Sequence, residues 1–215
     1  MSTQWRHRVM APRFTPLLGV FIGVVGGGVY WLAAQLWPTS IAVILSMLAT
    51  TLLSAGSSAG AGAGAGTVAR SWTADTGSVG FVFAILVKYN ALMALSAANV
   101  PFALPANFAL GLIMIAGQAS SRALLISVPA PPVRPAAKPA SLADIGIALA
   151  IGFAPAALIG LPGLVGLAGA ILARIVFIAY LRRRRPPFTA ADLDGPQQLT
   201  EACFYLSALA AWPYI

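Results

Sequence analysis

The segment ILARIVFIAYLRRRRPP, residues 171–187, joins an apolar run to four consecutive arginines and two prolines. An apolar run that ends in arginines is typical of a membrane-spanning helix whose end reaches the cytoplasm, because cytoplasmic loops carry an excess of Lys and Arg. The arginines complement the C-terminal dipole of the helix, and the prolines end it. The segment therefore predicts one membrane span and the side on which it ends.

The rest of the chain repeats this pattern of apolar stretches separated by short polar gaps. Of the 215 residues, 59% are apolar and only 8% are charged, whereas roughly a quarter of the residues of a soluble domain are charged. Each stretch is near the ~20 residues that span a bilayer core. We predict an all-α, polytopic membrane helix bundle in a single domain over residues 1–215. Its seven expected spans are about residues 17–36, 41–65, 79–97, 107–128, 145–160, 164–181 and 199–215.

Charged side chains occur only in alternate gaps, apart from a few inside the stretches. The gaps at 38–40, 98–106 and 161–163 carry no charged side chain. This alternation predicts a cytoplasmic N-terminus, a C-terminus outside, and polar chemistry at the cytoplasmic face. The charges of the remaining gaps are Arg6, Arg8, Arg13, Arg70, Asp75, Arg134, Lys138, Asp144, Arg182, Arg183, Arg184, Arg185, Asp192 and Asp194.

The net charge of +8 does not indicate nucleic-acid binding. The basic residues flank apolar stretches and do not form a patch with interleaved aromatic residues. We expect them to contact the anionic headgroups of membrane lipid, or an anionic substrate that arrives from the cytoplasm.

Four ionisable residues fall inside the apolar stretches, where charge is expensive and usually functional. Arg122 and Arg174 either snorkel to the headgroups or are buried, and Lys88 is too deep to snorkel cheaply. Glu201 is either functional or simply a charge at the N-terminal start of the last helix. We predict that Lys88 and Arg122 contribute to a polar cavity open to the cytoplasm.

Two local motifs concern helix ends and helix packing. Ser141 followed by Asp144 predicts a capping box that opens the fifth span. In the glycine-rich stretch 54–66, Gly56, Gly60 and Gly64 are four residues apart. They predict either a groove for a neighbouring helix or a glycine-rich cytoplasmic loop, since glycine disfavours helix.

Four stretches together resemble one family, the cobalamin synthases (adenosylcobinamide-GDP ribazoletransferases). Phe14-Thr15-Pro16-Leu17-Leu18-Gly19 is similar to the family's opening element, and the stretch 83–92 around Lys88 resembles its lysine-bearing third span. The segment 118–122, which ends in Ser121-Arg122, resembles a Ser-Arg element. The segment 197–206 is similar to the family's last span. The resemblance covers essentially the whole chain.

The resemblance implies a function in the assembly of the cobamide (vitamin B12) nucleotide loop. Such proteins join adenosylcobinamide-GDP to α-ribazole with release of GMP, use Mg²⁺, and lie in the bacterial cytoplasmic (inner) membrane. It implies Lys88, Arg122 and Glu201 as catalytic candidates and Gln197 and Gln198 as substrate-binding candidates.

The family's acidic metal-binding motif has no counterpart here. Gapless spacing from Pro16 places its histidine on Ser58 and its three aspartates on Gly60, Gly64 and Thr67. None of these side chains replaces a carboxylate on Mg²⁺. The acids left for a metal site are Asp75, Asp192 and Asp194.

Three interpretations remain open at this point. The first is a working transferase, in which Asp75, Asp192, Asp194 and Glu201 rebuild a metal site. The second is a catalytically degenerate paralogue that keeps the fold and binds a cobamide precursor or other membrane enzymes of cobamide assembly. The third is a small-anion transporter in which Lys88 and Arg122 bind the anion.

Overall fold

The structure is a computed structural model that describes residues 14–59, 77–97, 106–125, 141–183 and 194–214. These residues form seven α-helices and a closing 3₁₀ turn, and they include no strand. The all-α prediction is confirmed, and each predicted apolar stretch overlaps one of the helices. The helices are α1 (Thr15–Ala33), α2 (Thr39–Ala59), α4 (Gly77–Ala97), α5 (Ala106–Leu125), α6 (Leu142–Leu158), α7 (Leu161–Arg183) and α8 (Asp194–Ala211).

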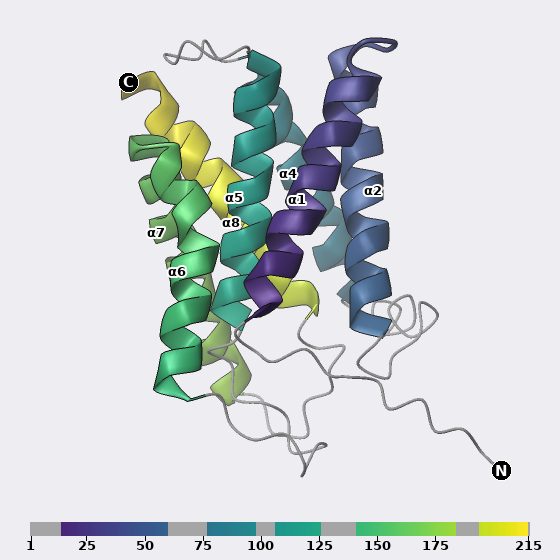
Figure 1. The fold of residues 1–215 in the computed structure, drawn as a ribbon. Helices are drawn as coiled ribbons and strands as arrows, with labels where there is room; N and C mark the ends of the chain where they lie inside the picture. The colour runs from purple at the N-terminus through teal and green to yellow at the C-terminus, as the bar shows by residue number, and fades with distance from the viewer. Residues whose placement is uncertain (1–13, 60–76, 98–105, 126–140, 184–193, 215) are drawn as a thin grey trace, which may run out of the picture.

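The helices lie side by side as a bundle (Figure 1). In this view α1 and α8 begin at the lower end and finish at the upper end, whereas α2 and α5 run downward. Helix α5 is central, because it packs against α1, α6, α7 and α8, while α4 packs chiefly on α8. Residues from both halves of the chain therefore meet around α5.

Glycines allow α1 to approach α5 closely. Gly19, Gly23 and Gly27 are four residues apart, so they share one face of α1. A Cβ atom at Gly23 would lie 2.5 Å from Ile115 Cα, and one at Gly27 would lie 3.1 Å from Gly111 Cα. This is the small-residue packing that membrane helices use in place of a hydrophobic driving force. We predicted such a face only at Gly56, Gly60 and Gly64, of which the last two lie outside the described residues.

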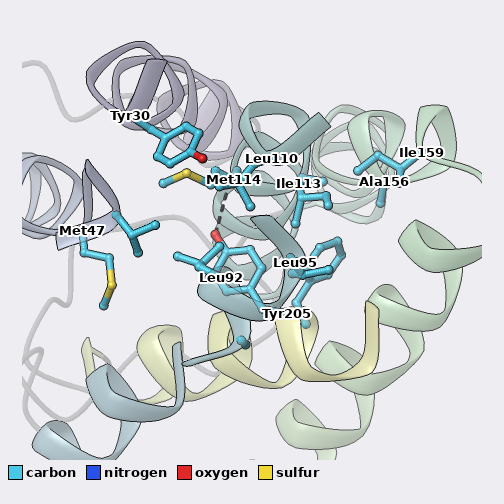
Figure 2. Close-up of a cluster of buried hydrophobic side chains, with 14 of the residues drawn as sticks. Tyr30, Met47, Leu92, Leu95, Leu110, Ile113, Met114, Ala156, Ile159 and Tyr205 are labelled. Carbon is cyan, nitrogen blue, oxygen red and sulfur yellow. Dashed lines mark hydrogen bonds between the residues drawn. The ribbon is translucent and has the colours of Figure 1, made fainter. Parts of the chain in front are cut away.

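The interior contains small side chains around a few large ones. Buried alanines occur on most helices, among them Ala42, Ala91, Ala116, Ala156 and Ala170. Figure 2 shows the larger members, with Leu92 and Leu95 of α4 beside Tyr205 of α8, whose hydroxyl points toward Met114 of α5. The core thus joins α4, α5 and α8.

The outer surface is apolar. Large hydrophobic side chains such as Phe21, Leu52, Phe83 and Leu172 are more than half exposed and lie on different helices. Exposed apolar side chains on this scale require a non-aqueous surrounding or a partner. Two segments, 15–33 and 161–180, are long and apolar enough to cross a membrane by length and composition.

The predicted capping box is present. Ser141 Oγ accepts a hydrogen bond from the backbone N–H of Asp144 at 3.1 Å, and Asp144 Oδ2 accepts one from the backbone N–H of Ser141 at 3.3 Å. These bonds satisfy backbone donors that the first turn of α6 would otherwise leave unpaired. Asp144 is therefore used as a helix cap.

The predicted start of the last helix is wrong. We placed it near residue 199, with Glu201 as a charge at its end, but α8 begins at Asp194. Pro196 does not prevent this, because proline is tolerated in the first turn, where a backbone N–H needs no partner within the helix. Glu201 consequently lies two turns inside α8 and is fully buried.

Candidate functional site

An ion pair between Lys88 and Glu201 lies inside the bundle. Lys88 Nζ is 2.6 Å from Glu201 Oε1, and the two side chains are 2% and 0% exposed. The same carboxylate oxygen accepts hydrogen bonds from Gln118 Nε2 at 2.9 Å and from the Tyr205 hydroxyl at 2.8 Å. We call these four residues the Glu201 cluster. They connect α4, α5 and α8.

The Glu201 cluster is held in place by the spacing of residues along α8 and by one glycine of α5. Tyr205 follows Glu201 by one turn, so both side chains lie on the same face of α8. The Tyr205 ring lies directly against Gly117 of α5, where a Cβ atom would come within 2.6 Å of Tyr205 Cε1. Gly117 therefore leaves the space in which Tyr205 can reach the carboxylate.

The electrostatics of the Glu201 cluster are those of a neutralised pair. An isolated buried ion costs several kcal/mol even after relaxation, and a close partner with good hydrogen bonds offsets that cost. Lys88 also lies 5.9 Å from the centre of the Tyr205 ring, which adds a cation–π contact. Among the described residues, Glu201 Oε2 has no hydrogen-bond partner. The charge of Lys88 is thus balanced within the protein.

The predicted burial of Lys88 is confirmed, and the structure identifies Glu201 as its partner. Because Glu201 is the one acid within the predicted spans, we reasoned that Lys88 and Arg122 could not both have ion-pair partners there, so that water or an anionic ligand would be needed. The earlier start of α8 brings Glu201 to the depth of Lys88. Gln118 and Tyr205 were not singled out as partners from the sequence. For Tyr205, the sequence signal was its place one helical turn after a glutamate in an apolar stretch.

Arg122 lies in the last turn of α5, inside the bundle. Its side chain is buried and donates a hydrogen bond from Nη2 to Ser54 Oγ of α2 at 3.1 Å. Gly19 of α1 makes room for it, because a Cβ atom there would be 3.0 Å from Arg122 Cδ. Arg122 does not snorkel outward; it connects α1, α2 and α5. It follows Gln118 by one turn on α5, next to the Glu201 cluster.

Arg174 of α7 is likewise buried and does not snorkel. Its Nε donates a hydrogen bond to the Leu124 carbonyl of α5 at 2.9 Å. Carbonyls in the last turn of a helix lack partners within the helix, and a cation there also complements the helix dipole. Arg174 therefore caps α5 from a neighbouring helix.

Gln197 and Gln198, our substrate-binding candidates, are in the first turn of α8 and are buried. Gln197 precedes Glu201 by one turn and shares its face of the helix. Its Nε2 atom has no hydrogen-bond partner among the described residues, nor does Oε1 of Gln118. One unsatisfied amide atom thus belongs to the Glu201 cluster itself, and the other lies one turn before Glu201 on α8.

The acids proposed as metal ligands are not brought together in the described part of the chain. Asp75 and Asp192 lie outside it, and Asp194 is the first residue of α8. Seven residues of helix separate Asp194 from Glu201 by roughly 10 Å, and Glu201 contacts Lys88. Within the described ranges no three His, Cys, Asp or Glu residues form a group that could hold a metal ion. The described residues therefore do not include the convergent oxygen ligands that Mg²⁺ prefers.

Comparisons with known proteins agree over nearly the whole chain. It is 32% identical to an adenosylcobinamide-GDP ribazoletransferase of Leptothrix cholodnii, over 97% of this chain and 87% of the relative. Proteins of the same name from Ralstonia nicotianae and Shewanella halifaxensis are 29% and 25% identical, over 94% and 93% of this chain and 84% of each relative. No protein-family profile matches the chain, and no solved structure matches it. The chain belongs to the adenosylcobinamide-GDP ribazoletransferase (cobalamin synthase) family.

Proposed function

We propose that this protein is a catalytically degenerate cobalamin synthase, which keeps the family's membrane scaffold and transfers little or no ribazole by itself. The observation that carries the proposal is the state of Glu201, the buried acid of the described core, which is held by Lys88 at 2.6 Å. With Asp144 used as a helix cap, neither acid is available as a metal ligand.

The reaction named for the relatives explains why the lack of an acid for a metal ion matters. Cleaving the pyrophosphate link of adenosylcobinamide-GDP builds negative charge on the departing GMP and on the transferred phosphoryl group. Removing a single well-placed stabiliser of such charge costs about 10²–10³ in rate. With gapless spacing from Pro16, the resemblance places the histidine and three aspartates of the family motif on Ser58, Gly60, Gly64 and Thr67.

The degenerate protein would still have a binding function. The retained helices and the buried Gln197, Gln198 and Arg122 provide polar groups for adenosylcobinamide-GDP, α-ribazole or a related precursor. Assembly with other membrane enzymes of cobamide synthesis is the other function that a retained scaffold supports.

The second candidate is an active transferase, and the identity over 97% of the chain favours it. It requires Asp75, Asp192 and Asp194 to bind Mg²⁺ at the cytoplasmic face. No observation favours an anion transporter, because the charge of Lys88 is already balanced by Glu201.

We further propose a single domain with seven spans, in the bacterial cytoplasmic membrane, with the N-terminus inside. The starts of α1 and α8 and the ends of α2 and α5 lie at one end of the bundle. The gaps that adjoin these ends carry the basic residues, which supports a cytoplasmic location for that end.

Complementation tests the proposal. The chain is expressed in a bacterium that lacks its own cobalamin synthase, with cobinamide and dimethylbenzimidazole supplied, and cobalamin is measured. We expect none, and production by the quadruple variant Ser58→His, Gly60→Asp, Gly64→Asp, Thr67→Asp would show that only the metal site is missing. Robust cobalamin production by the unaltered chain would refute the degenerate interpretation. Loss of that production in Asp192→Asn or Asp194→Asn would then support the active one.

A further inference from the structure

Helix α4 depends on a partner that is synthesised later. It packs chiefly on α8, and less on α2 and α5, its neighbours in the chain. Leu92 and Leu95 of α4 lie in the core beside Tyr205 of α8 (Figure 2). Before α8 is in place, α4 therefore lacks most of its packing surface.

The composition of α4 adds to this dependence. Lys88 lies at the twelfth of its 21 positions, near the bilayer centre, where a charged side chain is most costly. From the middle of the helix the ammonium group cannot reach the headgroups.

Glu201 is placed to remove this cost. It lies on α8, and its carboxylate contacts Lys88 at 2.6 Å while accepting hydrogen bonds from α5 and from α8 itself. It is the buried acid among the described residues, and no other ion pair is recorded for Lys88 there. We propose that Glu201 is the counter-ion that retains α4 in the membrane, so that α4 becomes a stable span only when α8 inserts.

The inference rests on the proposed topology, in which α4 ends outside the cytoplasm. The test uses the full chain with Ala97→Cys at the exposed end of α4 and Cys203→Ala to remove the natural thiol. Spheroplasts are treated with a membrane-impermeant maleimide. The labelled fraction of full-length protein is then measured against total thiol after solubilisation, so that a change in expression does not affect the readout.

In this parent we expect nearly complete labelling. Glu201→Gln keeps the shape and hydrogen-bonding atoms of the side chain but leaves Lys88 without its counter-ion, and we expect a severalfold loss of labelling. Lys88→Met combined with Glu201→Gln removes both charges, so labelling should return to the parent level. Recovery in the double variant is specific for charge, because loss of packing alone would add to the damage.

Two results would overturn the inference while leaving the topology intact. One is full labelling of Glu201→Gln, and the other is a double variant labelled no better than Glu201→Gln. An unlabelled parent would instead show that the proposed topology is wrong, and the inference would fail with it.

Discussion

Replacing Gly23 by alanine should destabilise the bundle by preventing the close approach of α1 to α5. The added Cβ atom would lie 2.5 Å from Ile115 Cα and 3.1 Å from its backbone nitrogen. These are backbone atoms, so no rotation of a side chain relieves the contact, and the helices must move apart. Overpacking of this kind typically costs about 1–3 kcal/mol.

Gly28→Ala is the matched control. It lies on the same helix, and a Cβ atom there would meet nothing within 4 Å. Alanine favours helix over glycine by about 1 kcal/mol, so Gly28→Ala should be neutral or stabilising. The difference between the two variants isolates the contact with α5.

The assay is reversible unfolding of the purified protein in mixed micelles with increasing denaturing detergent, followed by circular dichroism. We expect the free energy of unfolding of Gly23→Ala to be lower than that of Gly28→Ala by about 2 kcal/mol. Equal stability of the two variants would refute the packing of α1 on α5 through its glycine face.

Three further changes test individual contacts in the same assay. Gly117→Ala should lower the free energy of unfolding by about 1–3 kcal/mol, because its Cβ atom would lie 2.6 Å from Tyr205 Cε1 and would displace the ring. An unchanged free energy of unfolding would contradict the packing of the Glu201 cluster. Ser141→Ala removes the side-chain cap of α6 and should cost about 1 kcal/mol, whereas no loss would show that the cap is not formed. Arg174→Met keeps the length of the side chain but removes the hydrogen bond to the Leu124 carbonyl, so a loss of about 1.5–3 kcal/mol is expected; a stable variant would show that Arg174 does not cap α5.

The helices could be predicted from the sequence because lipid-facing spans require uninterrupted apolar residues. The start of α8 could not, because Asp194, Gly195 and Pro196 read as a loop although each is tolerated in a first turn. The sequence also could not decide whether Glu201 pairs with Lys88 or with Arg122. The burial of Lys88 followed from its own position, whereas its pairing with Glu201 depends on contact between helices from opposite halves of the chain.

Two other features also could be predicted only in part from the sequence. The four-residue spacing of Gly19, Gly23 and Gly27 was visible in the sequence, yet which helix they approach is decided by the tertiary arrangement. Arg174 could be recognised as a costly charge within a span, but its acceptor, the Leu124 carbonyl, is a backbone atom that no residue pattern indicates. Site residues that act through backbone contacts are therefore the least predictable.

The central claim is that this member of the family lacks the metal-dependent transfer step, and GMP release measures it most directly. The purified protein is reconstituted in lipid vesicles with adenosylcobinamide-GDP and α-ribazole, and GMP is quantified over a series of Mg²⁺ concentrations. We predict no release above that of protein-free vesicles at any Mg²⁺ concentration. Mg²⁺-dependent release that disappears in Asp192→Asn or Asp194→Asn would contradict it.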